Sequence, residues 1–373
     1  MSRVLFAGGG TGGHLYPALA LAEAMQAAAP AVEIHFVGAR RGIEARVLPE
    51  RGAPHTLLPI EPVHRRRMVR NWRVLPALVR SLARIAALFR RFRPQLVVGT
   101  GGYAAAPACL WAVVSGVPLA VQEQNSWPGA TTRLLARWAR QVHLGFPEAA
   151  AHLRPGRRTR VFTFGNPIRP PAERPDAHAA RSHLGLRQDA TVVLVVGGSQ
   201  GARAINELLL AALDGVATGA LVRPAGLELL WATGPAHLDG VRARLAEPVQ
   251  DWVHTVGYID DMPAALAASD AALSRAGAMA TAELLAWGIP ALLVPLPTAA
   301  ADHQTHNARA LDEAGAAVCL TEAGLTPAAL WNALGSLTRD MARRHAMADA
   351  ARARARPDAA RAIVRELLTL VPA

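Results

Sequence analysis

The chain has 373 residues, of which 51% are hydrophobic and 18% are charged. This composition excludes a disordered or fibrous protein, and the length predicts two domains around at least one large core. All 40 basic residues are arginine, and residues 1–165 carry 22 of them against 7 acids, whereas residues 166–373 carry 18 against 21. We therefore expect an anionic partner at the first half of the chain.

The first half alternates short apolar runs with longer helical stretches. Strands are predicted at 3–7, 33–38, 95–100 and 117–125, and a helix over 16–28. Such alternation predicts βαβ units and a parallel sheet. The uncharged residues 100–122 are interrupted by Pro107, Gly116 and Pro118, which argues against a membrane-spanning helix.

The pattern restarts after the proline-rich segment 164–175, which predicts an extended connector. Further strands are predicted at 191–196, 227–234, 254–259, 271–277 and 291–297, and a final amphipathic helix within 355–371. The expected fold class is α/β, with two Rossmann-like domains at 1–165 and 166–350 that face an interdomain cleft. The C-terminal segment 351–373 is expected to pack back towards the first domain.

A glycine-rich turn at residues 8–13 joins the first predicted strand to a helix. Uncovered N–H groups and the helix dipole suit a phosphate at such a turn. The turn also satisfies the G-x-G-x-x-G pattern of dinucleotide-binding dehydrogenases. An NAD site needs an acid at the end of the second strand, but Glu33 lies at its start, and Arg40 and Arg41 follow it. On this pattern an NADP-dependent oxidoreductase remains an alternative.

A second glycine-rich turn, residues 197–203, again lies between a predicted strand and a helix. Arg275 begins a third such segment, and Glu283 lies one to two turns into the helix that follows it. A carboxylate there is suited to accept hydrogen bonds from two ribose hydroxyls. The alternatives are a tight structural turn and a solvated glutamate. Because Arg275 and Glu283 accompany the second turn, we favour a ligand there. A dinucleotide site at the first turn alone would leave the second turn unexplained.

Eight segments bring a specific resemblance: GGGTGGHLYPALALA, VVGTGGYAAAPA, QEQNSWPG, GNPIR, VVGGSQGAR, GYIDDM, SRAGAMATAELLAWGIPALLVPLP and DHQTHNARAL. In this order along the whole chain they resemble the MurG family, the N-acetylglucosaminyltransferases of peptidoglycan synthesis. The resemblance implies a glycosyltransferase of the two-domain B type. Its C-terminal domain would hold UDP-N-acetylglucosamine, and its N-terminal domain the acceptor, a lipid-linked muramoyl pentapeptide.

The resemblance also implies the substrate-binding residues. These are Thr11, Gly12, Gly13, Asn125, Arg169, Ser199, Ile259, Ala278, Met279, Ala280, Thr281, Ala282, Glu283 and Gln304. Within this set Ile259 would receive the uracil and Glu283 the ribose. Arg169 on the connector suits a leaving diphosphate, and Gln304 with Asn307 could offer amides to sugar hydroxyls. As alternatives, Asn125 could cap a turn, and Asp261 and Asp302 could cap helices.

The reaction implied is direct displacement with inversion by the C4 hydroxyl of the muramoyl residue. His14 is the expected general base because its unperturbed pKa of about 6.5 allows it to accept a proton near neutrality. The alternatives are that His14 only fixes its loop, and that Glu123 is the base. There is no Asp-x-Asp motif and no zinc-like spacing of His or Cys, so neither a metal ion nor another cofactor is expected.

Three positions depart from the family pattern. Ala280 stands where threonine is common, Thr298 where tyrosine is common, and Gln122 where histidine usually precedes EQN. Each removes or changes a polar contact, and we expect donor affinity to be affected more than reaction type. Other enzymes of similar architecture, a transferase acting on diacylglycerol or a UDP-sugar epimerase, remain the nearest alternatives.

Residues 64–93 carry ten arginines and no acid. Apolar residues recur there every three or four positions at Leu75, Leu78, Leu82, Ile85 and Phe89, which predicts an amphipathic helix. Such a helix can bind an anionic membrane surface, consistent with a peripheral enzyme at the cytoplasmic face of the cell membrane. A packed core helix and a nucleic-acid-binding segment are the alternatives, but the mainly aliphatic face argues against nucleic acid.

Overall fold

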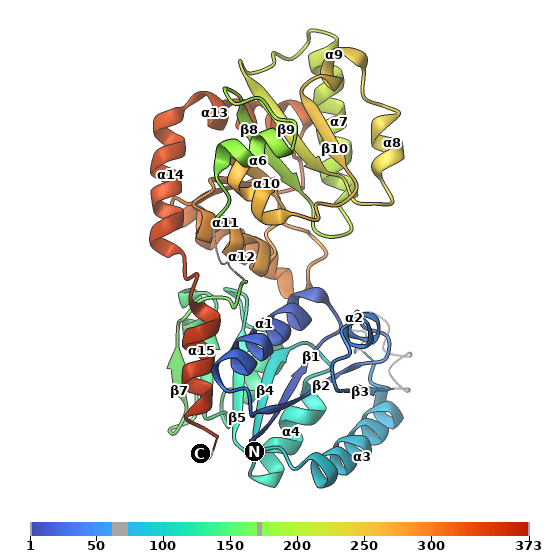
Figure 1. The fold of residues 1–373 in the computed structure, drawn as a ribbon, viewed down its shortest axis with the longest axis vertical. Helices are drawn as coiled ribbons and strands as arrows, with labels where there is room; N and C mark the ends of the chain where they lie inside the picture. Colours follow the sequence, from blue (N-terminus) through green and yellow to red (C-terminus); the bar gives the residue numbers. More distant parts are fainter. Residues whose placement is uncertain (1, 62–73, 170–173, 372–373) are drawn as a thin grey trace. The chain divides into compact units, whose positions relative to one another are not determined.

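The computed structural model describes residues 2–61, 74–169 and 174–371, and it divides into two compact units (Figure 1). Unit 1 comprises Met1–Arg169 and Arg356–Ala373, and unit 2 comprises Pro170–Ala355. Each unit is an α/β domain built on a parallel sheet, which confirms the predicted fold class. The boundaries differ from the expected ends at 165 and 350 by four and five residues.

Unit 1 contains a seven-stranded sheet in the order β3-β2-β1-β4-β5-β6-β7, paired in parallel throughout. Its strands are β1 (Arg3–Gly8), β2 (Glu33–Ala39), β3 (His55–Leu58), β4 (Leu96–Gly101), β5 (Leu119–Glu123), β6 (Gln141–Leu144) and β7 (Arg160–Phe162). Its helices are α1 (Gly12–Ala28), α2 (Glu44–Glu50), α3 (Val74–Phe92), α4 (Ala106–Ser115), α5 (Ala130–Leu135), the 3-10 helix η2 (Pro147–His152) and α15 (Ala359–Leu368).

The core of unit 1 explains why its strands are continuous apolar runs. In β1 the four residues Val4–Ala7 are all fully buried, because helices cover both faces of a parallel sheet. Ile363, Val364 and Leu367 of α15 belong to the same buried cluster as Leu15 of α1, and Figure 1 shows the two helices side by side. The last helix of the chain therefore completes the first unit.

Unit 2 contains a six-stranded parallel sheet in the order β10-β9-β8-β11-β12-β13. Its strands are β8 (Thr191–Val196), β9 (Leu227–Ala232), β10 (Val253–Val256), β11 (Ala271–Ser274), β12 (Ala291–Leu293) and β13 (Ala317–Cys319). Its helices are α6 (Ala177–His183), α7 (Arg203–Ala217), α8 (Leu238–Arg242), α9 (Glu247–Gln250), α10 (Met262–Ala268), α11 (Ala278–Trp287), the 3-10 helix η3 (Ala300–Asp302), α12 (His303–Glu313), α13 (Pro327–Arg339) and α14 (Met341–Arg354).

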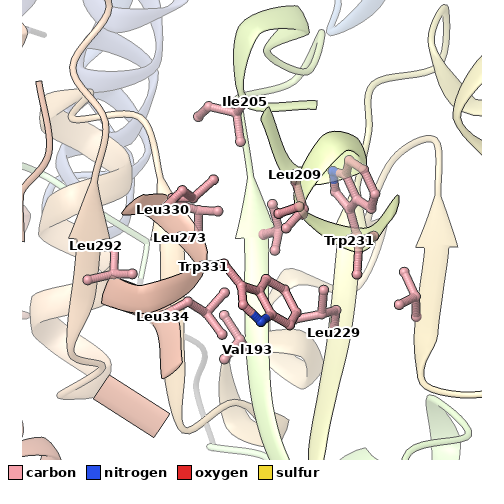
Figure 2. Packing of buried hydrophobic residues seen from close by; sticks show 14 of the residues in the cluster. Val193, Ile205, Leu209, Leu229, Trp231, Leu273, Leu292, Leu330, Trp331 and Leu334 are labelled. Atoms are coloured by element: carbon pink, nitrogen blue, oxygen red, sulfur yellow. The ribbon is translucent and has the colours of Figure 1, made fainter. Parts of the chain in front are cut away.

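One face of the unit 2 sheet packs against α7 and α13. Figure 2 shows Val193, Leu229 and Leu273, one from each of three neighbouring strands, in one cluster with Trp331 and Leu334 of α13. All five are at most 2% exposed. Burying such a side chain is worth about 1.5–3 kcal/mol, so this cluster fixes the sheet that carries the loops described below.

Helix α3 differs from its predicted role. Ile85 and Phe89, expected on a membrane-facing stripe, are buried in the core of unit 1, and Leu78 packs against that core. Leu75 and Val79 remain exposed, at 68% and 59%. The apolar stripe is thus mostly a core face, as the alternative interpretation held. Residues 64–73 of the predicted segment lie outside the described residues. Among those described, no helix is long and apolar enough to cross a membrane.

Candidate functional site

In unit 1 three loops that follow β1, β4 and β5 meet at the carboxyl edge of the sheet. The strands are neighbours in the order β1-β4-β5, so the loops that leave their carboxyl ends are neighbours too. At or next to these loops lie His14 in the first turn of α1, the pair Gly101–Gly102, and Gln124 with Asn125. Parallel α/β sheets bind ligands at this edge.

Contacts to both the side chain and the backbone of His14 hold this residue in place. Its Nδ1 lies 3.0 Å from the side-chain oxygen of Gln124, and its carbonyl accepts the Thr100 hydroxyl at 2.8 Å. A Cβ on Gly101 or Gly102 would lie 3.1 Å from Nδ1 or 2.9 Å from Cδ2 of the imidazole. Both glycines also have positive φ angles, 93° and 77°. The pair Gly101–Gly102 at the end of β4 therefore makes room for the imidazole.

The first glycine turn is anchored by Glu44, which the sequence did not single out. This glutamate is fully buried, and its carboxylate accepts the Gly10 N–H at 2.8 Å and the Ala39 N–H at 2.6 Å. A Cβ on Gly9 would lie 2.1 Å from its Oε1, and one on Gly38 2.3 Å from its Cγ. The sequence signal available for Glu44 was its place in GARRGIE, next to Gly38 and Gly42, together with the GGG run of the first turn. The loop's shape is therefore set by a buried carboxylate.

Glu123 orients the loop after β5. Its carboxylate accepts the backbone N–H groups of Asn125 and Gly129 at 3.1 and 2.9 Å, and the Asn125 side-chain amide at 3.2 Å. Two backbone bonds to one carboxylate fix a loop strongly. This geometry favours the orienting role over the alternative of Glu123 as the base.

At the amino terminus of α1, Thr11 and Gly13 are exposed and Gly12 is partly exposed. The first N–H groups of a helix have no intrahelical acceptor, so this end of α1 suits an anion. Arg169, expected near a diphosphate, instead forms an exposed ion pair with Glu23 of α1 at 2.7 Å. Glu23 also pairs with Arg51 at 3.2 Å.

In unit 2 the expected donor residues lie along one edge of the sheet. Ile259 follows β10, Ser199 follows β8, α11 follows β11, and Gln304 lies on α12 after β12. These are all carboxyl ends of parallel strands in the order β10-β9-β8-β11-β12. The structure thus brings the expected residues of the second half to a common edge.

The second glycine turn packs backbone against backbone. Gly201 has φ 73°, and a Cβ there would lie 1.9 Å from the carbonyl oxygen of Thr233. Asn206 ties α7 to the same carbonyl at 2.8 Å and accepts the Trp231 indole N–H at 3.2 Å. Asn206 was not identified from the sequence, because its only signal was a single asparagine in the apolar segment ARAINELLL. Ser199, which is part of this turn, is exposed.

The first two turns of α11 hold the run Ala278–Glu283. Met279, Ala280 and Ala282 are partly exposed, whereas Ala278 and Thr281 are buried. The Thr281 hydroxyl donates back to the Gly277 and Ala278 carbonyls, both at 3.1 Å. The Thr281 hydroxyl is therefore used within the helix.

Glu283 is partly buried, and its carboxyl makes no hydrogen bond or ion pair within the described ranges 2–61, 74–169 and 174–371. Burial raises the pKa of this carboxyl from 4.5 to about 7. A desolvated acceptor without a protein partner gains most from hydroxyl donors of a ligand. Its environment fits the expected role.

Gln304 and Asn307 lie one turn apart but behave differently. The Gln304 side-chain oxygen accepts the Leu296 N–H at 3.0 Å, which leaves its amide N–H groups to face a ligand. Asn307 is fully buried and donates to the Ala276 carbonyl at 3.2 Å. The prediction that Asn307 offers its amide to a sugar is therefore wrong, because this amide supports the loop before α11.

Two aspartates of unit 2, Asp261 and Asp302, make local contacts next to helices. Asp261 accepts the Ala264 N–H at 2.9 Å and caps α10, as predicted. Asp302 precedes α12, but its carboxylate accepts the Thr305 hydroxyl at 2.6 Å and makes no cap bond to the helix backbone. Within the part of the chain that the structure describes, no group of three His, Cys, Asp or Glu side chains is placed to hold a metal ion.

Two family models match this chain. Residues 4–144 match the glycosyltransferase family 28 N-terminal domain, and residues 192–363 match the glycosyltransferase family 28 C-terminal domain. Together the two matches cover most of both units, including every loop described above except the connector with Arg169.

Relatives match over the full length. The UDP-N-acetylglucosamine--N-acetylmuramyl-(pentapeptide) pyrophosphoryl-undecaprenol N-acetylglucosamine transferase of Moorella thermoacetica is 42% identical over 99% of both chains. The protein of the same name from Salinibacter ruber is 43% identical over 99% of this chain and 96% of its own. The crystal structure of Acinetobacter baumannii MurG covers 99% of this chain and 100% of its own at a TM-score of 0.78 and 28% identity. The calicheamicin glycosyltransferase CalG4, at 18% identity and a TM-score of 0.65 over 99% and 98% of the two chains, shares the fold.

Proposed function

Because the chain belongs to the MurG family within glycosyltransferase family 28, we propose that it transfers N-acetylglucosamine from UDP-N-acetylglucosamine to undecaprenyl-diphospho-muramoylpentapeptide in peptidoglycan synthesis. The acceptor atom is the C4 hydroxyl of the muramoyl residue, so lipid I becomes lipid II. The enzyme is a hexosyltransferase that inverts the anomeric carbon without a metal ion. The observation that carries the proposal is 42% identity to a transferase of this activity over 99% of both chains.

The donor half of the site is the carboxyl edge of unit 2. Ser199 and the first N–H groups of α11 suit the diphosphate of the donor, since a helix amino terminus favours an anion. Ile259 is 8% exposed and offers its backbone edge and apolar side to uracil. The Gln304 amide donates to hydroxyls of the transferred sugar, and Glu283 accepts from the ribose.

Donor binding is expected to depend on pH through Glu283. Only the ionised carboxylate accepts from two hydroxyls at once, and its pKa of about 7 means that it is protonated below neutrality. We expect the Kd for UDP-N-acetylglucosamine, measured by calorimetry, to rise about tenfold between about pH 8 and about pH 6. Glu283→Gln should bind weakly at both pH values. A wild-type Kd that does not change with pH would contradict this role of Glu283.

His14 removes the proton in the transfer step. The C4 hydroxyl oxygen of the acceptor attacks C1 of the sugar, the bond from C1 to the diphosphate oxygen breaks, and the hydroxyl proton passes to His14. UDP leaves with the bonding electrons. Backbone N–H groups and the α11 dipole stabilise the negative charge that develops on it.

The direct test is transfer of label. Purified protein is incubated with UDP-N-acetylglucosamine radiolabelled in the sugar and a short-chain analogue of the lipid-linked muramoyl pentapeptide, and the label is expected in the lipid product while unlabelled UDP is released. Conversion of the donor in the absence of acceptor would instead indicate a UDP-sugar epimerase. Donor binding without transfer would overturn the acceptor assignment.

We also propose that unit 1 binds the anionic surface of the membrane at its cytoplasmic face. The acceptor's undecaprenyl chain remains in the bilayer, while the donor is water-soluble. A pocket of about 560 Å³ between α3 and α4 has Phe89 and Trp111 among its apolar lining and Arg90 and Arg93 at its rim. Val114, one turn beyond Trp111, is 82% exposed. An apolar floor with a cationic rim suits acyl chains below anionic headgroups.

Membrane binding is expected to require the two rim arginines. Arg90→Glu together with Arg93→Glu should release the protein from phosphatidylglycerol vesicles in a sedimentation assay, because each reversal replaces attraction of about 1 kcal/mol by repulsion. The charge-matched control, Arg339→Glu with Arg343→Glu on α13 and α14 of unit 2, should still sediment. Equal loss in both double variants, or retention on DNA in place of vesicle binding, would overturn the proposal.

A further inference from the structure

Behind His14 lies a row of buried side-chain amides. Gln124 is 2% exposed, Gln122 is fully buried and Asn166 is 3% exposed. The Gln122 amide donates to the Asn166 side-chain oxygen at 3.2 Å, and the Asn166 amide donates to the Gln124 carbonyl at 2.9 Å. The row ends at the imidazole, where the Gln124 side-chain oxygen lies 3.0 Å from Nδ1 of His14.

The orientation of the Gln124 amide is fixed by its surroundings. Its Nε2 faces the carbonyl oxygens of Thr100 at 2.8 Å and of Gln122 at 3.0 Å, and also the side-chain oxygen of Gln122. A flipped amide would place an oxygen against three acceptors with no hydrogen between them. The Gln124 oxygen must therefore be the atom that faces His14.

This orientation selects one tautomer of His14. An amide oxygen only accepts, so Nδ1 of the imidazole must carry the hydrogen in their bond. In a neutral imidazole the other nitrogen, Nε2, then has a free lone pair. Nε2 makes no hydrogen bond with any residue that the structure describes. The ring is also confined on its other side by Gly101 and Gly102.

We propose that Gln124 is a positioning residue that holds His14 as the Nδ1–H tautomer, so that Nε2 is the atom that accepts the acceptor's hydroxyl proton. The proposal rests on the transfer reaction and on His14 as its base. It also changes the meaning of the departure at Gln122. The sequence led us to expect an effect of this departure on donor affinity. Gln122 lies in unit 1 and bonds to Gln124, so in this proposal it acts on the base instead.

The tautomer can be read directly from the ring nitrogens. Protein labelled with ¹⁵N-histidine is examined by two-bond ¹H–¹⁵N correlation near pH 8, and the His14 signals are identified by their loss in His14→Asn. We expect the Nδ1–H pattern in the native protein. Gln124→Met should lose it, and kcat for transfer should fall by about tenfold or more while KM for UDP-N-acetylglucosamine stays within about twofold.

A matched control is available in the same unit. Gln141 is also a buried glutamine, whose oxygen lies 3.1 Å from Nε2 of His143 and whose amide donates to the Glu366 carbonyl at 2.9 Å. Gln141→Met removes an equivalent amide away from His14, so it should leave the His14 tautomer and kcat unchanged even if it lowers the melting temperature.

The outcomes separate the two proposals. An Nε2–H pattern for His14 in the native protein would overturn the positioning role, and so would an unchanged kcat in Gln124→Met. The first of these needs no variant, so the proposal stays testable if Gln124→Met does not fold. A native protein that shows the Nδ1–H pattern but transfers no sugar would overturn the proposed function and leave the role of Gln124 in setting the tautomer supported.

Discussion

His14→Asn is expected to reduce kcat for sugar transfer by about 10²–10⁴-fold, the usual contribution of a general base. Asparagine places an amide N–H near the position of Nδ1 and so keeps the bond to the Gln124 oxygen, now 3.0 Å from the imidazole nitrogen. It has no basic nitrogen, so the loop survives and only proton removal is lost. Steady-state kinetics with the radiolabelled donor and the short-chain acceptor measure the effect.

Two measurements show whether the loss is chemical. The Kd of the variant for UDP-N-acetylglucosamine should equal that of the native protein, because the donor residues of unit 2 are untouched. The acid limb of the pH profile of kcat, measured at saturating donor so that the pH dependence of donor binding does not contribute, should also disappear. A decrease in kcat of less than about threefold would leave His14 only the role of fixing its loop.

Glu44→Ala is expected to lower the free energy of unfolding of unit 1 by about 3 kcal/mol or more. The fully buried carboxylate accepts the backbone N–H groups of Gly10 and Ala39. The Ala39 N–H would be left buried without an acceptor at a cost of about 1–3 kcal/mol, and the partly buried Gly10 N–H would lose its partner as well. Thermal unfolding should show a loss of several degrees, and hydrogen exchange should quicken in peptides covering the first glycine turn.

The control for this prediction lies on the same helix. Glu50 at the end of α2 is exposed and makes a single distant ion pair with Arg46 at 3.8 Å. Glu50→Ala should change stability by no more than about 0.5 kcal/mol, as is usual for surface positions. If the two variants melt alike, the buried carboxylate does not set the loop and the role given to Glu44 is wrong.

The parallel sheets could be predicted from sequence because their strands are buried on both faces. Runs such as VLFA and TVVLVV have no polar face to display, so their apolar continuity and the glycine turns after them identify both strand and edge. The position of His14 and Glu283 at these edges follows from the same pattern. The expected donor residues of the second half thus lie on one edge of one sheet.

What could not be predicted depends on contacts between residues far apart in the chain. Periodicity placed Ile85 and Phe89 on one face of α3 but could not tell whether the core or a membrane covers it. Asn307 has the same side-chain chemistry as a sugar-binding amide, and only its burial against Ala276 shows its structural role. Glu44 meets Gly10 across 34 residues, and the glycines near each of them do not by themselves show that the two are partners.

The place of α15 has a consequence for the order in which the chain folds during synthesis. Unit 1 begins at the first strand, yet Ile363, Val364 and Leu367 fill part of its core and are translated only after all of unit 2. Until then the apolar side of α1 around Leu15 lacks its cover on the ribosome-bound chain. Unit 2 is contiguous and can complete its core earlier, so the half that begins first finishes last.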